Sequence, residues 1–401
     1  MKYKELVNLI QSAHINFLFG SGLSRPYLST LGNIEKLLYE LSLKDIDKEL
    51  GVIVHSSILR HYFDTVMKPN FASEIVSKEK EYNEVLEEYK NFFMYLNSIM
   101  NNRHSGLLSK QVNIFSTNID TFVECAAEAQ YELNDGFRGR MKPVFDADCF
   151  NKIQSRESLF FHYKSEAPTF NYMKIHGSIN WVKTAESNSN GITLDESLNV
   201  LTSVQKVLEL LGDEHFIDFS KLTLANTTID QLITEAKAIK DKQDVDINDY
   251  ERFMNEYSHL VMINPTKAKF RETVIDVHFY ELMRLYSNAL EKPNSVLFVQ
   301  GFSFADEHIS QVTVRAANNN PTLLVIVFAY DKDAKDEIAD NLHKGGTWMN
   351  SNIKVMTTED FTSELDDEDK EKCNGLVNFD FKSINEYVFK VVANWVNRTI
   401  K

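Results

Sequence analysis

The sequence predicts a doubly wound α/β fold with a mainly parallel sheet, and two observations support this prediction. Short apolar runs rich in Val, Ile and Phe recur along the chain, and their hydrophobicity is continuous, as in strands buried on both faces. Segments with apolar residues at helical spacing separate these runs. Seven strands are expected: Ile15–Phe19, Val112–Phe115, Tyr172–Ile175, Leu260–Ile263, Val296–Val299, Leu323–Ala329 and Ile353–Met356.

Two intervals between the expected strands are too long for simple crossovers, and both have helical patterns. The first extends from about residue 26 to 104 and follows the first strand directly. The second extends from about residue 183 to 256 and begins with the loop-like segment Glu186–Gly191. We therefore expect one Rossmann-like core over residues 1–357, interrupted by two large helical insertions.

Residues 358–401 follow the last expected strand and differ in composition. Glu359–Glu371 contains eight acidic residues in thirteen positions, which predicts a solvated loop. Ile384–Ile400 has apolar residues at helical spacing, which predicts an amphipathic helix. Its apolar face would pack against its own domain or contact another subunit or partner.

Composition and charge exclude several classes of protein. The chain has 43% hydrophobic residues and a formal net charge of −15, and a surface of this sign disfavours direct nucleic-acid binding. The longest apolar run, Leu323–Tyr330, is well short of the ~20 residues that span a bilayer, and the N-terminus predicts an amphipathic helix instead of a signal sequence. A cytoplasmic protein without membrane contact is therefore expected. The cysteines Cys125, Cys149 and Cys373 lie far apart without a C-x-x-C pair, which favours three reduced thiols over a disulfide framework or a zinc site.

The first candidate site follows the first strand, at Gly20, Ser21, Gly22 and Ser24. Glycines at this position let the backbone turn sharply and approach a pyrophosphate. Free backbone amides would then bind its negative charge. The third glycine of the dinucleotide fingerprint is replaced by Arg25, so a plain tight turn is an equal alternative.

The second candidate site follows the second strand, at Asn118 and Asp120. The Asn118 amide offers a donor and an acceptor, and the Asp120 carboxylate could accept hydrogen bonds from ribose hydroxyls. The alternative for both residues is capping of an expected helix at Phe122–Gln130.

The third and fourth candidate sites follow two later strands. His176 stands directly after an apolar strand and before a glycine, and its ordinary pKa of about 6.5 suits proton transfer near neutrality. The alternative is a structural hydrogen-bonding histidine. Gly301 and Ser303 follow the strand at Val296–Val299 and could contact phosphate or ribose, with Asp306 expected to begin the next helix as its N-cap. Parallel topology would bring all four strand ends to one edge of the sheet.

Together these segments resemble those of the sirtuin-like family, in particular its bacterial branch found in antiviral defence. The resemblance covers most of residues 15–310 and keeps the family's order of motifs. It consists of a Gly-x-Gly-x-Ser loop, a Thr-x-Asn-x-Asp segment, a His-Gly motif, an Asn-Pro segment and a Gly-x-Ser-Phe-x-Asp segment, found here at Gly20–Ser24, Ser116–Asp120, Lys174–Trp181, Ile263–Lys267 and Gly301–Ile309.

The resemblance implies that NAD⁺ is the substrate. It implies that Asn118, Asp120 and His176 face the nicotinamide ribose, with Asn118 holding the ribose and a water and His176 acting as general base. It places six residues around the phosphates and the adenosine half: Gly20, Ser21, Gly22, Ser24, Gly301 and Ser303.

One departure from the family changes the expected acceptor. Protein-deacylating sirtuins carry a four-cysteine zinc module after the His-Gly motif, whereas this chain has no cysteine between Asn151 and Lys372, so no zinc is expected. Water is therefore the expected acceptor, which predicts a NAD⁺ glycohydrolase that depletes NAD⁺ as a defence effector in abortive infection. The alternatives are a protein deacylase, an ADP-ribosyltransferase, or a non-catalytic NAD⁺ or ADP-ribose sensor. By the same resemblance we expect a homo-oligomer, with a HerA-type ATPase as one candidate partner.

Overall fold

The computed structural model describes residues 2–30, 34–103, 108–160, 162–184, 191–222, 227–242, 246–263 and 277–398. The loop expected at Glu186–Gly191, apart from Gly191, and the part of the Asn-Pro segment that follows Ile263 lie outside these residues.

The core of the fold is a seven-stranded sheet in which all paired neighbours are parallel. Its order is β13-β12-β11-β1-β2-β8-β3. The chain extends the sheet from β1 to one side through β2 and β8, and then to the other side through β11, β12 and β13, so the order reverses between β1 and β11. This is the doubly wound, Rossmann-like arrangement expected from the sequence, and ligands of such folds bind at the carboxyl ends of the strands beside the reversal. The strands are β1 (His14–Phe19), β2 (Gln111–Ser116), β3 (Glu132–Asn134), β8 (Thr169–Lys174), β11 (Ser295–Gln300), β12 (Leu324–Phe328) and β13 (Ile353–Met356).

Six of the seven expected strands belong to this sheet, and the expectation for Leu260–Ile263 is wrong. Within this segment only Met262 forms a bridge, an isolated antiparallel one with Gly177. All four residues are buried, but Leu260 and Met262 contact one apolar cluster and Val261 and Ile263 another. The continuous apolar run therefore reflects a segment that passes between two cores, a pattern that cannot be distinguished from a buried strand by sequence alone. The edge strand β3 was not anticipated.

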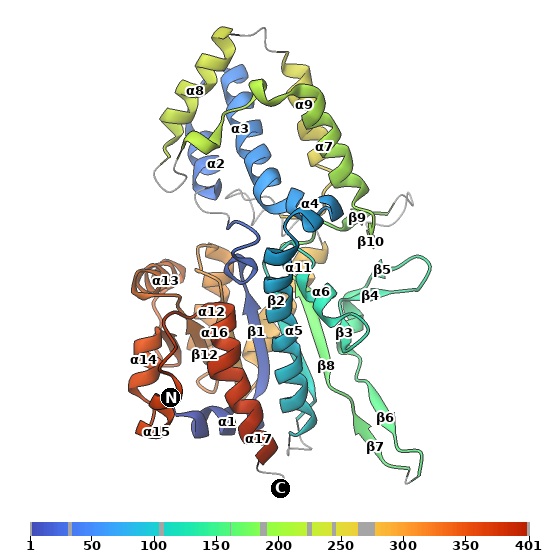
Figure 1. The fold of residues 1–401 in the computed structure, drawn as a ribbon, viewed down its shortest axis with the longest axis vertical. Coiled ribbons are helices and arrows are strands. Elements are labelled where there is room, and N and C mark those ends of the chain that lie inside the picture. The colour runs from blue at the N-terminus through green and yellow to red at the C-terminus, as the bar shows by residue number, and fades with distance from the viewer. Residues whose placement is uncertain are drawn as a thin grey trace.

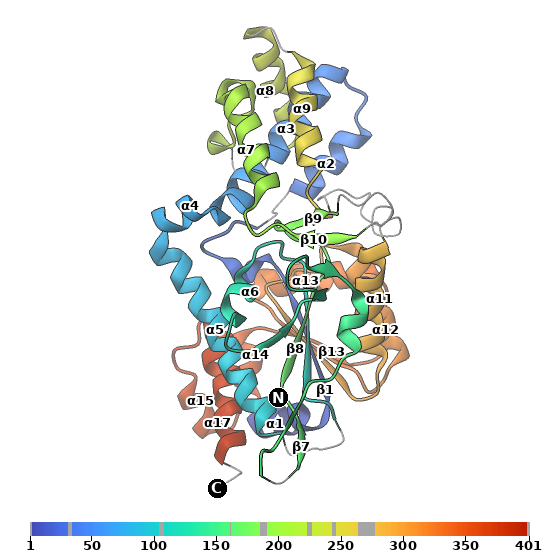
Figure 2. The same ribbon diagram turned by 90° about the vertical axis from the view of Figure 1, so that its right-hand side faces the viewer.

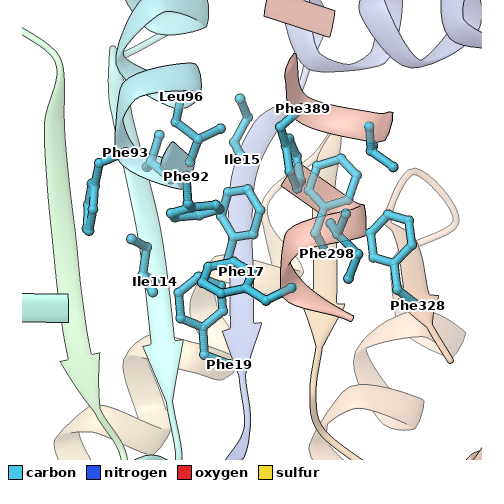
Figure 3. Close-up of a cluster of buried hydrophobic side chains, with 14 of the residues drawn as sticks. Ile15, Phe17, Phe19, Phe92, Phe93, Leu96, Ile114, Phe298, Phe328 and Phe389 are labelled. Carbon is cyan, nitrogen blue, oxygen red and sulfur yellow. The ribbon is translucent and has the colours of Figure 1, made fainter. Parts of the chain in front are cut away.

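Helices cover both faces of the sheet, as Figure 2 shows with α5 and α17 on one side and α11 and α12 on the other. On the first face, Phe17 of β1 packs its ring 5.0 Å from Phe92 and 5.4 Å from Phe298, within the aromatic cluster of Figure 3. The next residue, Leu18, joins the cluster of the opposite face. The helices of the two layers are α1 (Tyr3–Ser12), α5 (Glu79–Asn101), α6 (Phe122–Ala127), α11 (Val277–Glu291), α12 (Glu307–Asn319) and α13 (Lys332–Gly345).

Five helices from the two long intervals form a second body at the end of the molecule beyond the carboxyl ends of the strands (Figure 1). They share a separate apolar core to which both intervals contribute, for example Ile53 and Leu232, both fully buried. The last helix of the first interval, α5, instead packs on the sheet. The helices of this body are α2 (Ile34–Leu43), α3 (Lys48–Tyr62), α7 (Asn199–Leu211), α8 (Ile229–Lys242) and α9 (Ile247–Tyr257).

Smaller elements complete the fold. The short helix α4 (Ala72–Ser77) leads into α5. A four-stranded sheet has the order β4-β5-β10-β9, and β6 and β7 form a projecting hairpin (Figure 1). Their strands are β4 (Phe137–Arg138), β5 (Val144–Phe145), β6 (Ser155–Glu157), β7 (Lys164–Glu166), β9 (Trp181–Lys183) and β10 (Ile192–Leu194).

The acidic segment is helical, which corrects the expectation of a loop at Glu359–Glu371. It contains α14 (Thr358–Ser363) and α15 (Asp367–Lys372). Thr357 and Asp360 form a reciprocal capping box, and acidic residues in a first turn favour a helix because they lie near the positive end of its dipole. Buried Phe361 ties the segment to the core.

The C-terminal segment forms α16 (Phe381–Ile384), one π-helical stretch over Asn385–Phe389, and α17 (Lys390–Arg398). Of the two alternatives for its apolar face, the structure shows packing within the chain, against α5 and α1. Val388 and Val392 are fully buried in the cluster on that face of the sheet.

Candidate functional site

A cavity of about 350 Å³ lies where the loops after β1, β2, β8 and β11 meet. Glu35 of α2, Tyr62 of α3 and Val66 from the segment that follows α3 also line this cavity. Segments that are far apart in the sequence therefore converge at the carboxyl edge beside the reversal of strand order. Eight of the nine predicted site residues line this cavity: Ser21, Gly22, Ser24, Asn118, Asp120, His176, Gly301 and Ser303.

The ninth predicted residue, Gly20, joins the two glycine loops. Its amide donates to the Gln300 carbonyl, and the Gly22 amide donates to the Gly301 carbonyl, both at 3.0 Å. A Cβ atom on Gly301 would lie 2.7 Å from the Leu23 nitrogen, and Gly301 has a φ of +63°. Glycine is thus required for the loops to approach each other. These two amides hold the loops together, whereas the sequence suggested amides free to meet a phosphate.

A second cavity of about 670 Å³ adjoins the first. The two share the glycine loops, including Gly22, Gly301 and Ser303. On the far side of the glycine loops, the second cavity is lined by the aromatic rings of Phe328 and Tyr330 and by the cation Arg25. Together the cavities suit an elongated ligand whose middle passes the glycine loops and whose far end is a flat ring.

Asn118 lines the first cavity and carries a buried acceptor that has no partner among the described residues. Its backbone amide donates to the Ser116 hydroxyl at 3.0 Å, and its Nδ2 lies 3.5 Å from the Ser24 hydroxyl. Its Oδ1 is buried and has no hydrogen-bond partner among the described residues. An unsatisfied buried acceptor is costly, and such an exception in a folded protein calls for a partner such as a ligand hydroxyl or a water.

Asp120 is fully engaged within the protein. Its Oδ2 accepts a 2.8 Å hydrogen bond from Ser24, and its Oδ1 accepts the amide of Phe122, the first residue of α6, at 3.2 Å. Burial raises the pKa of Asp120, and the nearby charge of Lys174 opposes this effect. The local helix contact, one of the two alternatives for Asp120, is present, and each carboxylate oxygen accepts a hydrogen bond within the protein.

The hydroxyl of Ser24 belongs to the same network, although the residue was expected beside the phosphates. It lies 3.1 Å from the hydroxyl of Tyr89, a fully buried residue of α5. Burial raises the pKa of Tyr89 well above its ordinary value, so the phenol stays neutral. Sequence reasoning missed Tyr89 because its helical spacing marks it only as a core residue.

Lys174 is a second residue that sequence reasoning left without a role. Its side chain is 2% exposed and lies beneath the loop that carries Asp120. The ammonium group donates to the Asp120 carbonyl at 2.6 Å, to Glu124 at 2.7 Å and to the Ser178 hydroxyl at 2.6 Å. A lysine at the end of an apolar strand was the available signal, since a buried charge needs partners.

His176 is 7% exposed and stands at the end of β8. Its carbonyl accepts the amide of Ile263 at 2.9 Å, and the following Gly177 has a φ of +79° that a side chain would strain. Its Nε2 lies 3.2 Å from Oδ2 of Asp306. Asp306 also caps α12, as the sequence predicted, but nothing in the sequence indicated its contact with His176.

The described residues form no metal-binding cluster, no disulfide and no membrane-spanning helix. No three His, Cys, Asp or Glu side chains gather in the described part of the chain as a metal site would require. All three cysteines are free, with Cys125 exposed and Cys149 and Cys373 buried. No described helix has the length and apolar character needed to span a bilayer.

Comparison with known proteins gives no family for this chain. No protein-family model matches it, and no curated protein sequence matches it significantly.

Proposed function

We propose that the chain is a sirtuin-like NAD⁺ glycohydrolase that cleaves NAD⁺ to nicotinamide and ADP-ribose. The observation that carries the proposal is that Asn118 and His176, from two different strand ends, line one cavity beside the reversal of strand order. Doubly wound sheets bind dinucleotides at this edge. The motif resemblance suggests NAD⁺ as the substrate, and the cavity is lined by both side chains.

The two adjoining cavities fit the two halves of a dinucleotide. The first offers Asn118 and His176 to the nicotinamide ribose, and the second offers the aromatic wall of Phe328 and Tyr330 to the adenine. The pyrophosphate would pass Gly22 and Gly301, where both cavities meet. Arg25, in the second cavity, supplies a positive charge for this region.

The chemistry follows from the bond that breaks. The C1′–N bond electrons return to the pyridinium nitrogen, so nicotinamide leaves as a neutral molecule without protonation by the protein. The ribose then has oxocarbenium character, and a water forms the new C1′–O bond while its proton passes to His176. We assign Oδ1 of Asn118, which has no partner among the described residues, to hold that water or a ribose hydroxyl.

Water as the acceptor is supported by the size of the first cavity. The side chains of Glu35, Tyr62 and Val66 form part of its wall. A space of about 350 Å³ suits a small acceptor better than a peptide side chain that must enter with its backbone. By the same proposal the enzyme acts in the cytoplasm, depletes NAD⁺ as an antiviral effector, and is controlled by self-assembly or by a HerA-type ATPase.

Nicotinamide release tests the proposed activity directly. The purified chain, alone and with the product of its neighbouring gene, is incubated with NAD⁺ and the products are separated by chromatography. We expect nicotinamide and ADP-ribose in equal amounts, and a loss of about 10²-fold or more in His176→Ala and in Asn118→Ala. His259→Ala, at a half-exposed histidine that does not line the cavity, is the matched control and should keep wild-type activity.

Three outcomes would contradict the proposal. Turnover that requires an acylated or acceptor protein would favour a deacylase or an ADP-ribosyltransferase. Calorimetric binding of NAD⁺ without turnover in any assembled state would favour a sensor. Equal nicotinamide release by wild type and His176→Ala would remove His176 from the reaction.

A further inference from the structure

The contact between His176 and Asp306 joins two strand ends across the cavity. His176 follows β8 and Asp306 follows β11, and both residues line the cavity. The distance between Nε2 and Oδ2 is 3.2 Å, and each side chain is only 9% exposed. A carboxylate this close to a sheltered imidazole can hold the ring in one orientation, because little water competes for the contact.

The carboxylate of Asp306 is held in place by the helix that it begins. Its Oδ1 accepts the amides of His308 at 3.0 Å and Ile309 at 3.2 Å, and its carbonyl accepts the amide of Ser310. Ile309 is buried in the core on that face of the sheet, which anchors the first turn of α12. Oδ1 is therefore used by the helix, while Oδ2 is directed to His176.

The neighbouring histidine does not replace His176 as the partner of this carboxylate. Burial lowers the pKa of His308, Asp306 opposes this effect, and a positive charge on His176 adds to it. The direct contact with Oδ2 belongs to His176.

We propose that Asp306 is a positioning residue that fixes the tautomer and orientation of His176. This inference rests on the proposed function, in which His176 takes the proton of the attacking water. In this role Asp306 accepts a hydrogen bond from Nε2–H, so the lone pair that acts as base lies on Nδ1. When Nδ1 takes the proton, the imidazolium that forms remains paired with the carboxylate.

Asp306→Asn separates this role from helix capping. The amide oxygen can still accept the two amides of α12, but Nδ2 then faces His176 and donates where the carboxylate accepted. Nε2 of His176 must then accept a hydrogen bond, so the ring proton moves to Nδ1. The Nδ1 lone pair that acts as base is thereby lost. We expect kcat for nicotinamide release to fall about 10²–10⁴-fold, with KM changed less than about threefold.

Two further variants exclude a merely structural effect. Asp306→Ser retains a hydroxyl that caps the helix but cannot reach His176, so it should also lose kcat while it keeps a melting temperature close to that of Asp306→Asn. In a His176→Ala background, Asp306→Asn should cause no further loss, because the two residues act as a unit. Wild-type kcat in Asp306→Asn, or additive losses in the double variant, would overturn the proposal.

A measurement without catalysis keeps this inference separate from the proposed function. The chain is labelled with ¹⁵N-histidine, and the His176 ring signals are assigned from their absence in His176→Ala. We expect a proton on Nε2 in the wild type and on Nδ1 in Asp306→Asn. The same tautomer in both proteins would refute the positioning role even if NAD⁺ is hydrolysed. The expected change of tautomer in a protein that never releases nicotinamide would instead show that only the proposed function fails.

Discussion

Ser24 donates a 2.8 Å hydrogen bond to the carboxylate of Asp120, and this bond joins the loop after β1 to the loop after β2. The same hydroxyl lies 3.1 Å from Tyr89 and 3.5 Å from the amide nitrogen of Asn118. Ser24 thus connects the glycine loop, helix α5 and the side chain of Asn118, which is proposed to hold the reacting water.

Removal of this hydroxyl should affect both stability and activity. Ser24→Ala leaves the buried carboxylate of Asp120 without one of its donors, and we expect a loss of about 1–3 kcal/mol in the free energy of unfolding. Nicotinamide release should also fall, because Asn118 loses a contact that orients its amide. Denaturant unfolding measures the first effect and chromatography the second.

Ser42→Ala is the control for this variant. The Ser42 hydroxyl bonds only to a carbonyl on an exposed part of α2, so its loss should change the free energy of unfolding by less than about 0.5 kcal/mol. Equal stabilities for the two variants would show that the network around Asp120 contributes nothing measurable.

The pKa of Asp120 predicts a dependence of stability on pH. Burial raises this pKa above 3.8, so the folded state holds the proton more tightly than the unfolded state. The free energy of unfolding of the wild type, relative to Asp120→Asn, should therefore fall as pH rises from 3.8 through the folded-state pKa, and stay constant above it. Denaturant unfolding of both proteins at several pH values from 4 to 8 gives this difference. A difference that rises with pH would mean that hydrogen bonds and Lys174 outweigh burial.

The buried pair of Lys174 and Glu124 predicts a strong coupling. Lys174→Met leaves Glu124 buried without its cation, and such uncompensated charges cost about 3–5 kcal/mol. Adding Glu124→Gln removes the charge and should recover a large part of this loss. Urea unfolding of both single variants and the double variant gives the coupling energy, and additive losses would contradict a direct interaction.

The glycines differ in what an added methyl group would meet. Gly301→Ala places a Cβ 2.7 Å from the Leu23 nitrogen at a positive φ, so we expect a loss of about 1–3 kcal/mol and weaker NAD⁺ binding. Gly51→Ala, within α3, meets only the Ile46 side chain at 3.6 Å. It should raise stability by about 0.5–1 kcal/mol, since alanine favours a helix. Differential scanning calorimetry compares the two, and a stabilised Gly301→Ala would contradict the packing of the glycine loops.

The strands could be predicted because burial on both faces leaves a continuous apolar pattern, as in Val296–Val299. The same pattern led to the wrong prediction of a strand at Leu260–Ile263, because a segment between two cores is also apolar at every position. The acidic composition of Glu359–Glu371 suggested solvent exposure, yet it does not oppose a helix when the acids lie in first turns.

The candidate site was predictable at the level of loops and less so at the level of atoms. Small polar residues after parallel strands must meet at one edge, and Asn118 and His176 do line one cavity. The engagement of both oxygens of Asp120, and the contact of Asp306 with His176, depend on where distant loops place single atoms. Sequence spacing carries no information about such distances.

The sequence by itself determined the doubly wound sheet and the edge at which its polar residues gather, because continuous apolar runs that alternate with helical segments predict parallel strands buried on both faces. Only the tertiary structure decided that helices from two separate intervals form one body over the cavity. It also decided that Ser24 donates a hydrogen bond to Asp120 and that Asp306 contacts His176. These relationships arise when long-range packing brings side chains within hydrogen-bond distance, and no local pattern encodes that separation.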